Sequence, residues 1–246
     1  MNKTLMSRTF LCVFVLAGFL SGLTFAQAQE IRPALLMQPM PDFTLQAYQG
    51  GEITLSQFKG KNVLLIFPRG LAGEDHWCHI CNYQYADLAA LDQSQQLRET
   101  LNLEILFVLP YSPEMVEDWV AKFADQMDDI EGWKNPPEPE KLDDRGKRRM
   151  EWAKRAFPES YTFRKGEVPL PFPVLIDAEQ KVSNGLGLFT TEWGGSRVEQ
   201  NIPTVYIVDE QGILKYKYIS QNTFDRPGSK YLLKFVSILN KLAETE

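Results

Sequence analysis

The feature that most constrains this chain is a pair of cysteines, Cys78 and Cys81, placed between an apolar run and a helical pattern. The apolar run over residues 63–67 predicts a buried strand. After the cysteines, apolar and aromatic residues recur at the spacing of one helix face. The pair is therefore expected at a strand-to-helix junction, in the first turn of the helix. The free N–H groups and the positive dipole end of a helix stabilise a thiolate there.

A thiolate in this position supports dithiol redox chemistry. The thiolate is the nucleophilic form of cysteine, so a lowered pKa would make Cys78 reactive near neutral pH. The second thiol, Cys81, could then attack the mixed disulfide and release the product. A purely structural disulfide is the weaker interpretation, because a bridge between residues three apart closes almost no loop and stabilises little.

The N-terminus has the pattern of an export signal. Lys3 and Arg8 precede an uncharged apolar run, and Ala-Gln-Ala at residues 26–28 matches a cleavage site. We therefore expect residues 1–28 to be a cleaved signal peptide and residues 29–246 to form the mature, periplasmic or otherwise exported chain. The alternative is a retained transmembrane anchor. The apolar run is short for a membrane span and no stop-transfer charges follow, so we expect no stable membrane anchor after cleavage.

Length, charge and cysteine content limit the class of protein. A chain of 246 residues suits one domain with an elaboration. Loss of Lys3 and Arg8 would leave 24 basic against 32 acidic residues, so the formal net charge would change from −6 to −8. No basic stripe indicates a nucleic acid or an anionic lipid as a partner. Cys78 and Cys81 would be the only cysteines of the mature chain.

The rest of the chain alternates predicted strands and helices. Strands are expected over residues 103–109, 172–177, 202–208 and 213–219, with a small N-terminal hairpin over residues 43–55. Helices are expected from the cysteines to about residue 100, after Ser112, near residues 182–186 and over residues 230–242. This alternation predicts an α/β layer architecture with a central mixed sheet flanked by helices.

Residues 128–169 interrupt the alternation. The segment is proline-rich at first and then charged and helical in pattern, so we expect a helical insertion. A long insertion in a compact domain is often functional, and this one could cap the site. A solvated surface helix is the simpler interpretation of its mixed charges.

Several segments together resemble the thioredoxin superfamily and, within it, the redoxin branch. They are Phe-Pro-Arg-Gly at residues 67–70, Trp-Cys-His-Ile-Cys-Asn at 77–82, the strand-Asp-Gly-Leu stretch at 172–187, the Pro-Thr strand from 203 and Asp-Arg-Pro at 225–227. The branch includes the AhpC/TSA peroxiredoxin-like proteins and the exported TlpA/ResA-like thiol–disulfide oxidoreductases. The resemblance implies a thioredoxin-like fold and a thiol or disulfide protein partner or electron donor.

The resemblance also implies roles for particular residues. Cys78 would attack a disulfide and Cys81 would resolve the intermediate. Pro203 would be a cis proline beside the cysteines, where it and Trp77 would shape the substrate groove. An ordinary trans proline at a strand start is the alternative.

A thiol peroxidase that reduces hydroperoxides is the alternative activity. Typical peroxiredoxins place Pro seven residues, and Thr or Ser three residues, before the cysteine that attacks the peroxide. Counting back from Cys78 gives Leu71 and Asp75, and counting back from Cys81 gives Glu74 and Cys78. Neither frame restores the motif, so the sequence favours the oxidoreductase.

The two histidines of the chain, His76 and His79, flank Cys78. A protonated His79 would stabilise the Cys78 thiolate, so we expect the histidines to tune its pKa. Zinc or copper bound by these histidines and the cysteines is a third possibility, which would make the protein a redox-sensitive binding or metal-carrying module. A Cys-x-x-Cys at a helix start does not readily converge with an intervening His on one ion, so we expect no metal.

No cofactor is expected either. Covalent haem attachment is excluded, because Asn82 follows Cys81 where a histidine would be needed. Asp225 and Arg226 could bring a cation near the site, but the sequence favours a surface salt bridge between them.

Overall fold

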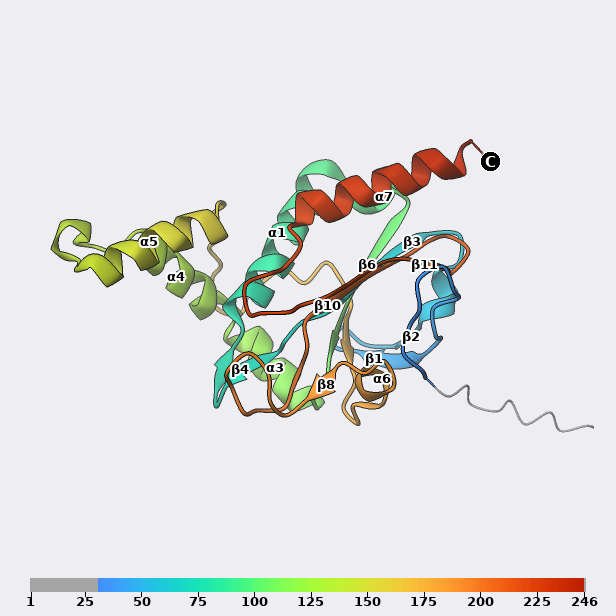
Figure 1. Ribbon diagram of the computed structural model, residues 1–246, viewed down its shortest axis with the longest axis horizontal. Coiled ribbons are helices and arrows are strands. Elements are labelled where there is room, and N and C mark those ends of the chain that lie inside the picture. The colour runs from blue at the N-terminus through green and yellow to red at the C-terminus, as the bar shows by residue number, and fades with distance from the viewer. Residues whose placement is uncertain (1–30, 246) are drawn as a thin grey trace, which may run out of the picture.

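The computed structural model describes residues 31–245, and the expected signal peptide at 1–28 lies outside them. A seven-stranded sheet forms the centre of the molecule, in the order β11-β10-β3-β6-β7-β1-β2 (Figure 1). Its strands are β1 (Thr44–Ala47), β2 (Glu52–Thr54), β3 (Asn62–Phe67), β6 (Leu103–Leu109), β7 (Val174–Ile176), β10 (Thr204–Val208) and β11 (Leu214–Ile219). The central strands β3, β6 and β7 are parallel, and the outer pairs are antiparallel. The predicted mixed sheet and N-terminal hairpin are thus confirmed.

Seven α-helices accompany the sheet in the described part of the chain. They are α1 (His79–Gln95), α2 (Leu97–Thr100), α3 (Pro113–Ala121), α4 (Phe123–Lys134), α5 (Asp144–Ala156), α6 (Lys181–Gly185) and α7 (Ser229–Ala243). The single helix expected from the cysteines to residue 100 is interrupted at Gln96, whose φ of 52° is left-handed. Ser112 caps α3 as expected, since its hydroxyl accepts a hydrogen bond from Met115 N.

The alternation of side chains along β3 divides the interior into two cores. Leu64 and Ile66 face one core, which α1, α3, α4 and α7 cover, while Val63 and Leu65 face the other, which α6 and the N-terminal segment cover. All of these side chains are almost completely buried. A central strand buried on both faces explains why residues 63–67 are continuously apolar.

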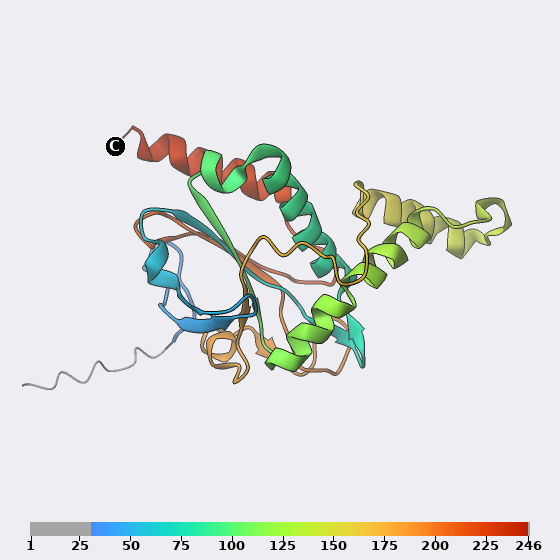
Figure 2. The same ribbon diagram turned by 180° about the vertical axis from the view of Figure 1, so that it is seen from behind.

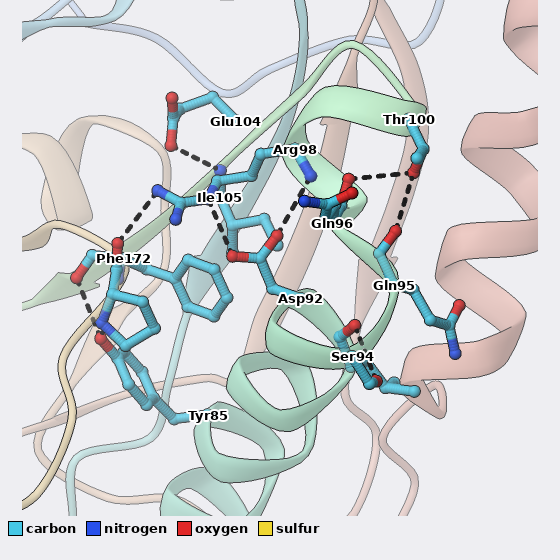
Figure 3. Close-up of polar contacts among 12 residues, drawn as sticks. Tyr85, Asp92, Ser94, Gln95, Gln96, Arg98, Thr100, Glu104, Ile105 and Phe172 are labelled. Carbon is cyan, nitrogen blue, oxygen red and sulfur yellow. Dashed lines mark hydrogen bonds and ion pairs between the residues drawn. The ribbon is translucent and has the colours of Figure 1, made fainter.

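Side chains of α1 and α2 hold the segment that leads from the insertion to β7 by hydrogen bonds (Figure 3). Arg98 Nε donates to Asp92 Oδ2 at 3.0 Å, and Arg98 Nη1 donates to the carbonyl of Pro171 at 3.1 Å. The Tyr85 hydroxyl donates to the carbonyl of Phe172 at 2.9 Å and accepts from its N–H at 3.2 Å. These bonds place β7 beside β6 although residues 128–169 intervene in the chain.

Helices α4 and α5 form an arm that extends from one end of the molecule (Figures 1 and 2). The arm contains the first two thirds of the expected insertion, and the fold of the sheet continues beyond it. Its root is packed firmly, because Ala153 and Phe157 are buried in the same core as α1. No helix between residues 31 and 245 is long and apolar enough to cross a membrane.

Candidate active site

The two cysteines lie where α1 begins, beyond the carboxyl end of β3. Cys78 is the N-cap residue of α1 and Cys81 lies in its first turn, as the sequence predicted. A small hairpin of β4 (Leu71–Gly73) and β5 (His76–Trp77) separates β3 from the helix. The N–H of Cys78 donates to the carbonyl of Gly70 at 2.9 Å, so the hairpin returns the chain to the end of β3. The carboxyl end of parallel strands is the usual place for a functional site in α/β sheets.

The two sulfur atoms are in contact and both are buried. Cys81 Sγ donates to Cys78 Sγ at 2.7 Å, and only 5% of Cys78 and 2% of Cys81 are exposed. The N–H of Arg69 donates to Cys81 Sγ at 3.3 Å. Both cysteines are free thiols in the structure. The pair is therefore placed for exchange between a dithiol and a disulfide.

The pKa values of the two thiols move in opposite directions. The hydrogen bond from Cys81 and the positive charges of Arg226 and Arg69 lower the pKa of Cys78 to about 6, although burial opposes this shift. Burial and the neighbouring Cys78 sulfur raise the pKa of Cys81 well above its usual value. Near neutral pH the pair consists of a thiolate at Cys78 and a thiol at Cys81.

Arg226 forms the expected ion pair with Asp225, but the pair is largely buried beside the cysteines instead of lying on the surface. The sequence favoured a surface salt bridge with Asp225, but the Arg226 side chain is only 8% exposed and its charge acts on both cysteines. The Asp225 carboxylate lies 3.6 Å from Arg226 and accepts hydrogen bonds from the N–H groups of Gln221 and Asn222. The turn that precedes α7 thus directs Arg226 inward to the site.

Arg69 supplies the second positive charge and is held by residues far away in the sequence. Its Nε donates to Gln200 Oε1 at 2.7 Å, and its Nη2 donates to the carbonyl of Trp193 at 2.9 Å and to Ser196 Oγ at 2.6 Å. The guanidinium groups of Arg69 and Arg226 lie 5.1 and 5.8 Å from the centre of the Trp193 ring. The loop at Trp193 therefore holds both cations.

His79 faces the arm. Its Nε2 lies 3.0 Å from Asp129 Oδ2, and its ring centre lies 4.5 Å from that of Trp133. Burial lowers the pKa of His79, which favours the neutral ring, and His79 is not among the groups that shift the pKa of Cys78. The stabilisation of the thiolate that was expected from His79 comes instead from the Cys81 hydrogen bond and the two arginines. His76 is exposed, with its ring centre 5.0 Å from that of His79.

Trp77 lies beneath the site and not along a groove. It is completely buried, its Nε1 donates to Asp118 Oδ2 at 2.8 Å, and its ring packs edge-on against Tyr111 at 5.3 Å. None of its surface reaches solvent, so Trp77 can shape the substrate groove only through the residues that pack against it. It supports the cysteines from the core.

Pro203 is a trans proline, so the expected cis bond is wrong: residues 31–245 contain no cis peptide bond. The neighbouring backbone is already satisfied in the trans form, since Ile202 N donates to the carbonyl of Leu188 and Ser220 N donates to the carbonyl of Pro203. Trans is also the intrinsically favoured form of an X–Pro bond. Pro203 is buried at the start of β10.

Comparison with known proteins assigns the family. The AhpC/TSA family model matches residues 36–217, which is more than half of the chain. The chain belongs to the AhpC/TSA family. Among solved structures, a reduced 2-Cys peroxiredoxin from Plasmodium vivax is similar in fold, with a TM-score of 0.51 and 18% sequence identity. That match covers 85% of this chain and 98% of the peroxiredoxin. No curated protein matches the sequence.

This AhpC/TSA protein is accordingly a thiol-dependent oxidoreductase or peroxidase with a thioredoxin-like fold. The site contains what such chemistry requires: a stabilised thiolate, a second thiol in contact with it and two fixed cations. In the described part of the chain, no three His, Cys, Asp or Glu side chains come together as a possible metal site.

Proposed function

We propose that this AhpC/TSA protein is an exported thiol–disulfide oxidoreductase in which Cys78 is the nucleophile and Cys81 is the resolving cysteine. The opposed pKa shifts of two sulfur atoms 2.7 Å apart carry the assignment. A thiolate is needed for the first attack, and a protonated second thiol avoids competition for the same substrate. Each sulfur is suited to one of the two steps.

In the reducing direction the Cys78 thiolate attacks one sulfur of a substrate disulfide. A bond forms between that sulfur and Cys78, and the other half of the substrate leaves as a thiolate. Cys81 then gives its proton to the departing thiolate and attacks Cys78 Sγ, which releases the second half. Two electrons have passed to the substrate and the protein holds a Cys78–Cys81 disulfide. A thiol protein or another dithiol donor restores the reduced pair by the reverse steps.

Export is proposed from the sequence of residues 1–28, which has the charged, apolar and small-residue regions of a signal peptide. Expression of the full chain followed by fractionation tests it. A periplasmic product that begins at Gln29 is the expected result, and a membrane-bound product with an intact N-terminus would contradict it.

A thiol peroxidase is the second candidate, and membership of the AhpC/TSA family favours it. In that reaction the Cys78 thiolate would take one oxygen from a hydroperoxide to form a sulfenic acid, an alcohol or water would leave, and Cys81 would close the disulfide with loss of water. Within residues 31–245 the hydrogen bond of Cys78 Sγ is to Cys81, and no Ser or Thr hydroxyl bonds to it. The group that would position a peroxide is therefore missing from this sulfur.

One comparison of rates tests the assignment. The reduced protein is mixed with oxidised glutathione or with hydrogen peroxide, and loss of free thiol is followed over time. We expect faster oxidation by the disulfide, and accumulation of a glutathione adduct on Cys78 in the Cys81→Ser variant. Cys78→Ser should form no adduct. Oxidation by peroxide at least tenfold faster than by the disulfide would instead support the peroxidase.

A further inference from the structure

A pocket of about 160 Å³ lies beside the cysteines, where α1, α5 and the start of α7 meet. Ile80, which stands between the two cysteines in the sequence, forms part of its wall. Arg226, whose charge acts on both cysteines, forms another part. Neither cysteine lines the pocket, so it is adjacent to the redox site through Ile80 and Arg226 and separate from the sulfur pair itself.

Two residues of the pocket wall, Arg226 and Gln84, carry buried hydrogen-bond donors without acceptors. Arg226 Nη1 donates to Ser220 Oγ and to the carbonyl of Asn222, but Nε and Nη2 have no partner among the described residues. Gln84 Nε2, also from the pocket wall, is buried and unpaired as well. Buried polar groups in proteins are nearly always hydrogen-bonded, so these donors indicate an acceptor that a ligand supplies. A guanidinium group binds carboxylates through two parallel hydrogen bonds.

The N-terminus of α7 adds its dipole to the positive charge of Arg226, while Asp87, which also lines the pocket, accepts a hydrogen bond from the Tyr161 hydroxyl at 2.7 Å. Gly228 and Ser229 lie in its wall, and α7 has 15 residues, so its dipole is well developed. No side chain caps this helix and its first turn contains no acidic residue. An anion is therefore the natural partner of its free N–H groups.

The opposite wall is apolar and comes from the arm. Trp152 and Phe157 line the pocket, and Phe224 packs edge-on against Trp152 with ring centres 5.1 Å apart. Pockets for whole drug-sized ligands usually measure about 300–1,000 Å³, so this one accommodates one end of a molecule. The combination of donors and aromatic rings fits a charged group on a short apolar stem.

We propose that this pocket is a subsite for the carboxylate of a small disulfide substrate. The carboxylate would bind Arg226 and Gln84, the stem would lie against Trp152, and the disulfide would face Cys78. The proposal rests on the proposed function, since it names the class of disulfide that the cysteine pair accepts. It also gives the arm a role: α5 supplies the apolar wall that the remainder of the fold lacks.

Matched disulfides test the subsite. The reduced protein is mixed with dithiodipropionate, bis(hydroxyethyl) disulfide or cystamine, which are anionic, neutral and cationic, and each rate is divided by the rate of a free thiol with the same disulfide. We expect a preference of about tenfold for the anionic over the neutral disulfide, the size expected for one charge-assisted pair of hydrogen bonds. Cystamine should be the slowest.

Variants assign the preference to the pocket. Arg226→Lys keeps the positive charge and loses the paired hydrogen bonds, so the preference should fall to about twofold. Gln84→Leu should lower the preference severalfold, because one of the two side chains that would bind the carboxylate is lost. Arg197→Lys makes the same exchange at a side chain that is 85% exposed, and the preference should be retained.

The outcomes separate the two proposals. Failure to react with all three disulfides would overturn the proposed function. Equal rates with the anionic and neutral disulfides, after division by the free-thiol rates, would overturn only the subsite. So would a preference that survives Arg226→Lys and Gln84→Leu.

A peptide test separates a small-molecule substrate from a protein. A peptide disulfide with Glu beside its cysteine is compared with the same peptide in which Gln replaces that Glu. If the Glu peptide exceeds the Gln peptide in rate by a larger factor than the anionic small disulfide exceeds the neutral one, the carboxylate belongs to a protein side chain. The small-molecule assignment is then wrong.

Discussion

His79 Nε2 lies 3.0 Å from Asp129 Oδ2, and this contact joins the residue after Cys78 to helix α4 of the arm. The Trp133 ring packs against His79, and the guanidinium of Arg149 lies 4.8 Å from the centre of that ring. The contact draws the imidazole toward the arm, and its pKa is lowered by burial. Stabilisation of the Cys78 thiolate therefore comes from the Cys81 hydrogen bond and from the positive charges of Arg226 and Arg69.

The first prediction compares these two sources of charge. Arg226→Gln should raise the pKa of Cys78 from about 6, because loss of a nearby cation destabilises the thiolate. His79→Gln should leave that pKa nearly unchanged. Thiolate absorbance in the ultraviolet, followed as a function of pH, measures both. If the pKa of Cys78 shifted more in the His79 variant than in the Arg226 variant, the histidine would be the main group that sets this pKa.

The second prediction concerns the pH dependence of alkylation. Because the pKa of Cys78 is lowered to about 6, its reaction with iodoacetamide should be half-maximal near pH 6 and fully developed at neutral pH. The pKa of Cys81 is raised, so Cys81 should stay unmodified until strongly alkaline pH. Peptide mapping by mass spectrometry assigns the label. Equal labelling of both cysteines at pH 7 would contradict the division of roles.

The third prediction concerns Gly70, whose carbonyl accepts the N–H of Cys78. Its φ is +79°, and an added Cβ would lie 2.3 Å from the hydroxyl oxygen of Tyr111. That hydroxyl cannot easily move, because it accepts from Leu71 N and donates to the carbonyl of Glu199. Gly70→Ala should therefore lower the free energy of unfolding by about 2–4 kcal/mol, through backbone strain and overpacking together.

Gly60→Ala is the matched control for this variant. Gly60 has a φ of +92°, but an added Cβ would meet nothing within 4 Å. Gly60→Ala should lower the free energy of unfolding only through the strain of a left-handed backbone, by about 1–2 kcal/mol. Urea unfolding of both variants gives the comparison. Equal losses would mean that the contact with Tyr111 does not constrain the loop.

Local signals in the sequence were sufficient for the elements of the fold. The apolar run at 63–67 and the cap at Ser112 correctly placed β3 and the start of α3, because strand burial and helix capping depend on neighbouring residues. The break at Gln96 was missed, since nothing in its immediate sequence requires a left-handed residue. The position of the cysteines at the helix start was predicted for the same local reason.

The electrostatics of the site could not be predicted in this way. Arg69, Trp193 and Arg226 are separated by more than thirty residues from one another, and their contacts arise only when β3, the 189–201 segment and the turn before α7 meet. The role of His79 was mispredicted for the opposite reason: closeness in sequence did not bring its ring to the thiolate. It is adjacent to Cys78 in the sequence, yet the first turn of α1 and the arm together direct its ring toward Asp129.

The last prediction concerns the reduction potential of the Cys78–Cys81 pair. A lowered pKa stabilises the reduced form as its thiolate, and this makes the disulfide more oxidising. We therefore expect a potential above that of thioredoxin, about −270 mV, and toward the oxidising value of DsbA, about −120 mV. Arg226→Gln should shift it back toward the thioredoxin value, since the thiolate loses one of its two cations, whereas His79→Gln should leave it in place. Equilibration with glutathione mixtures at pH 7 measures all three proteins. A wild-type potential at or below the thioredoxin value would show that the arginines do not set the redox balance, and the protein would then serve as a reductant.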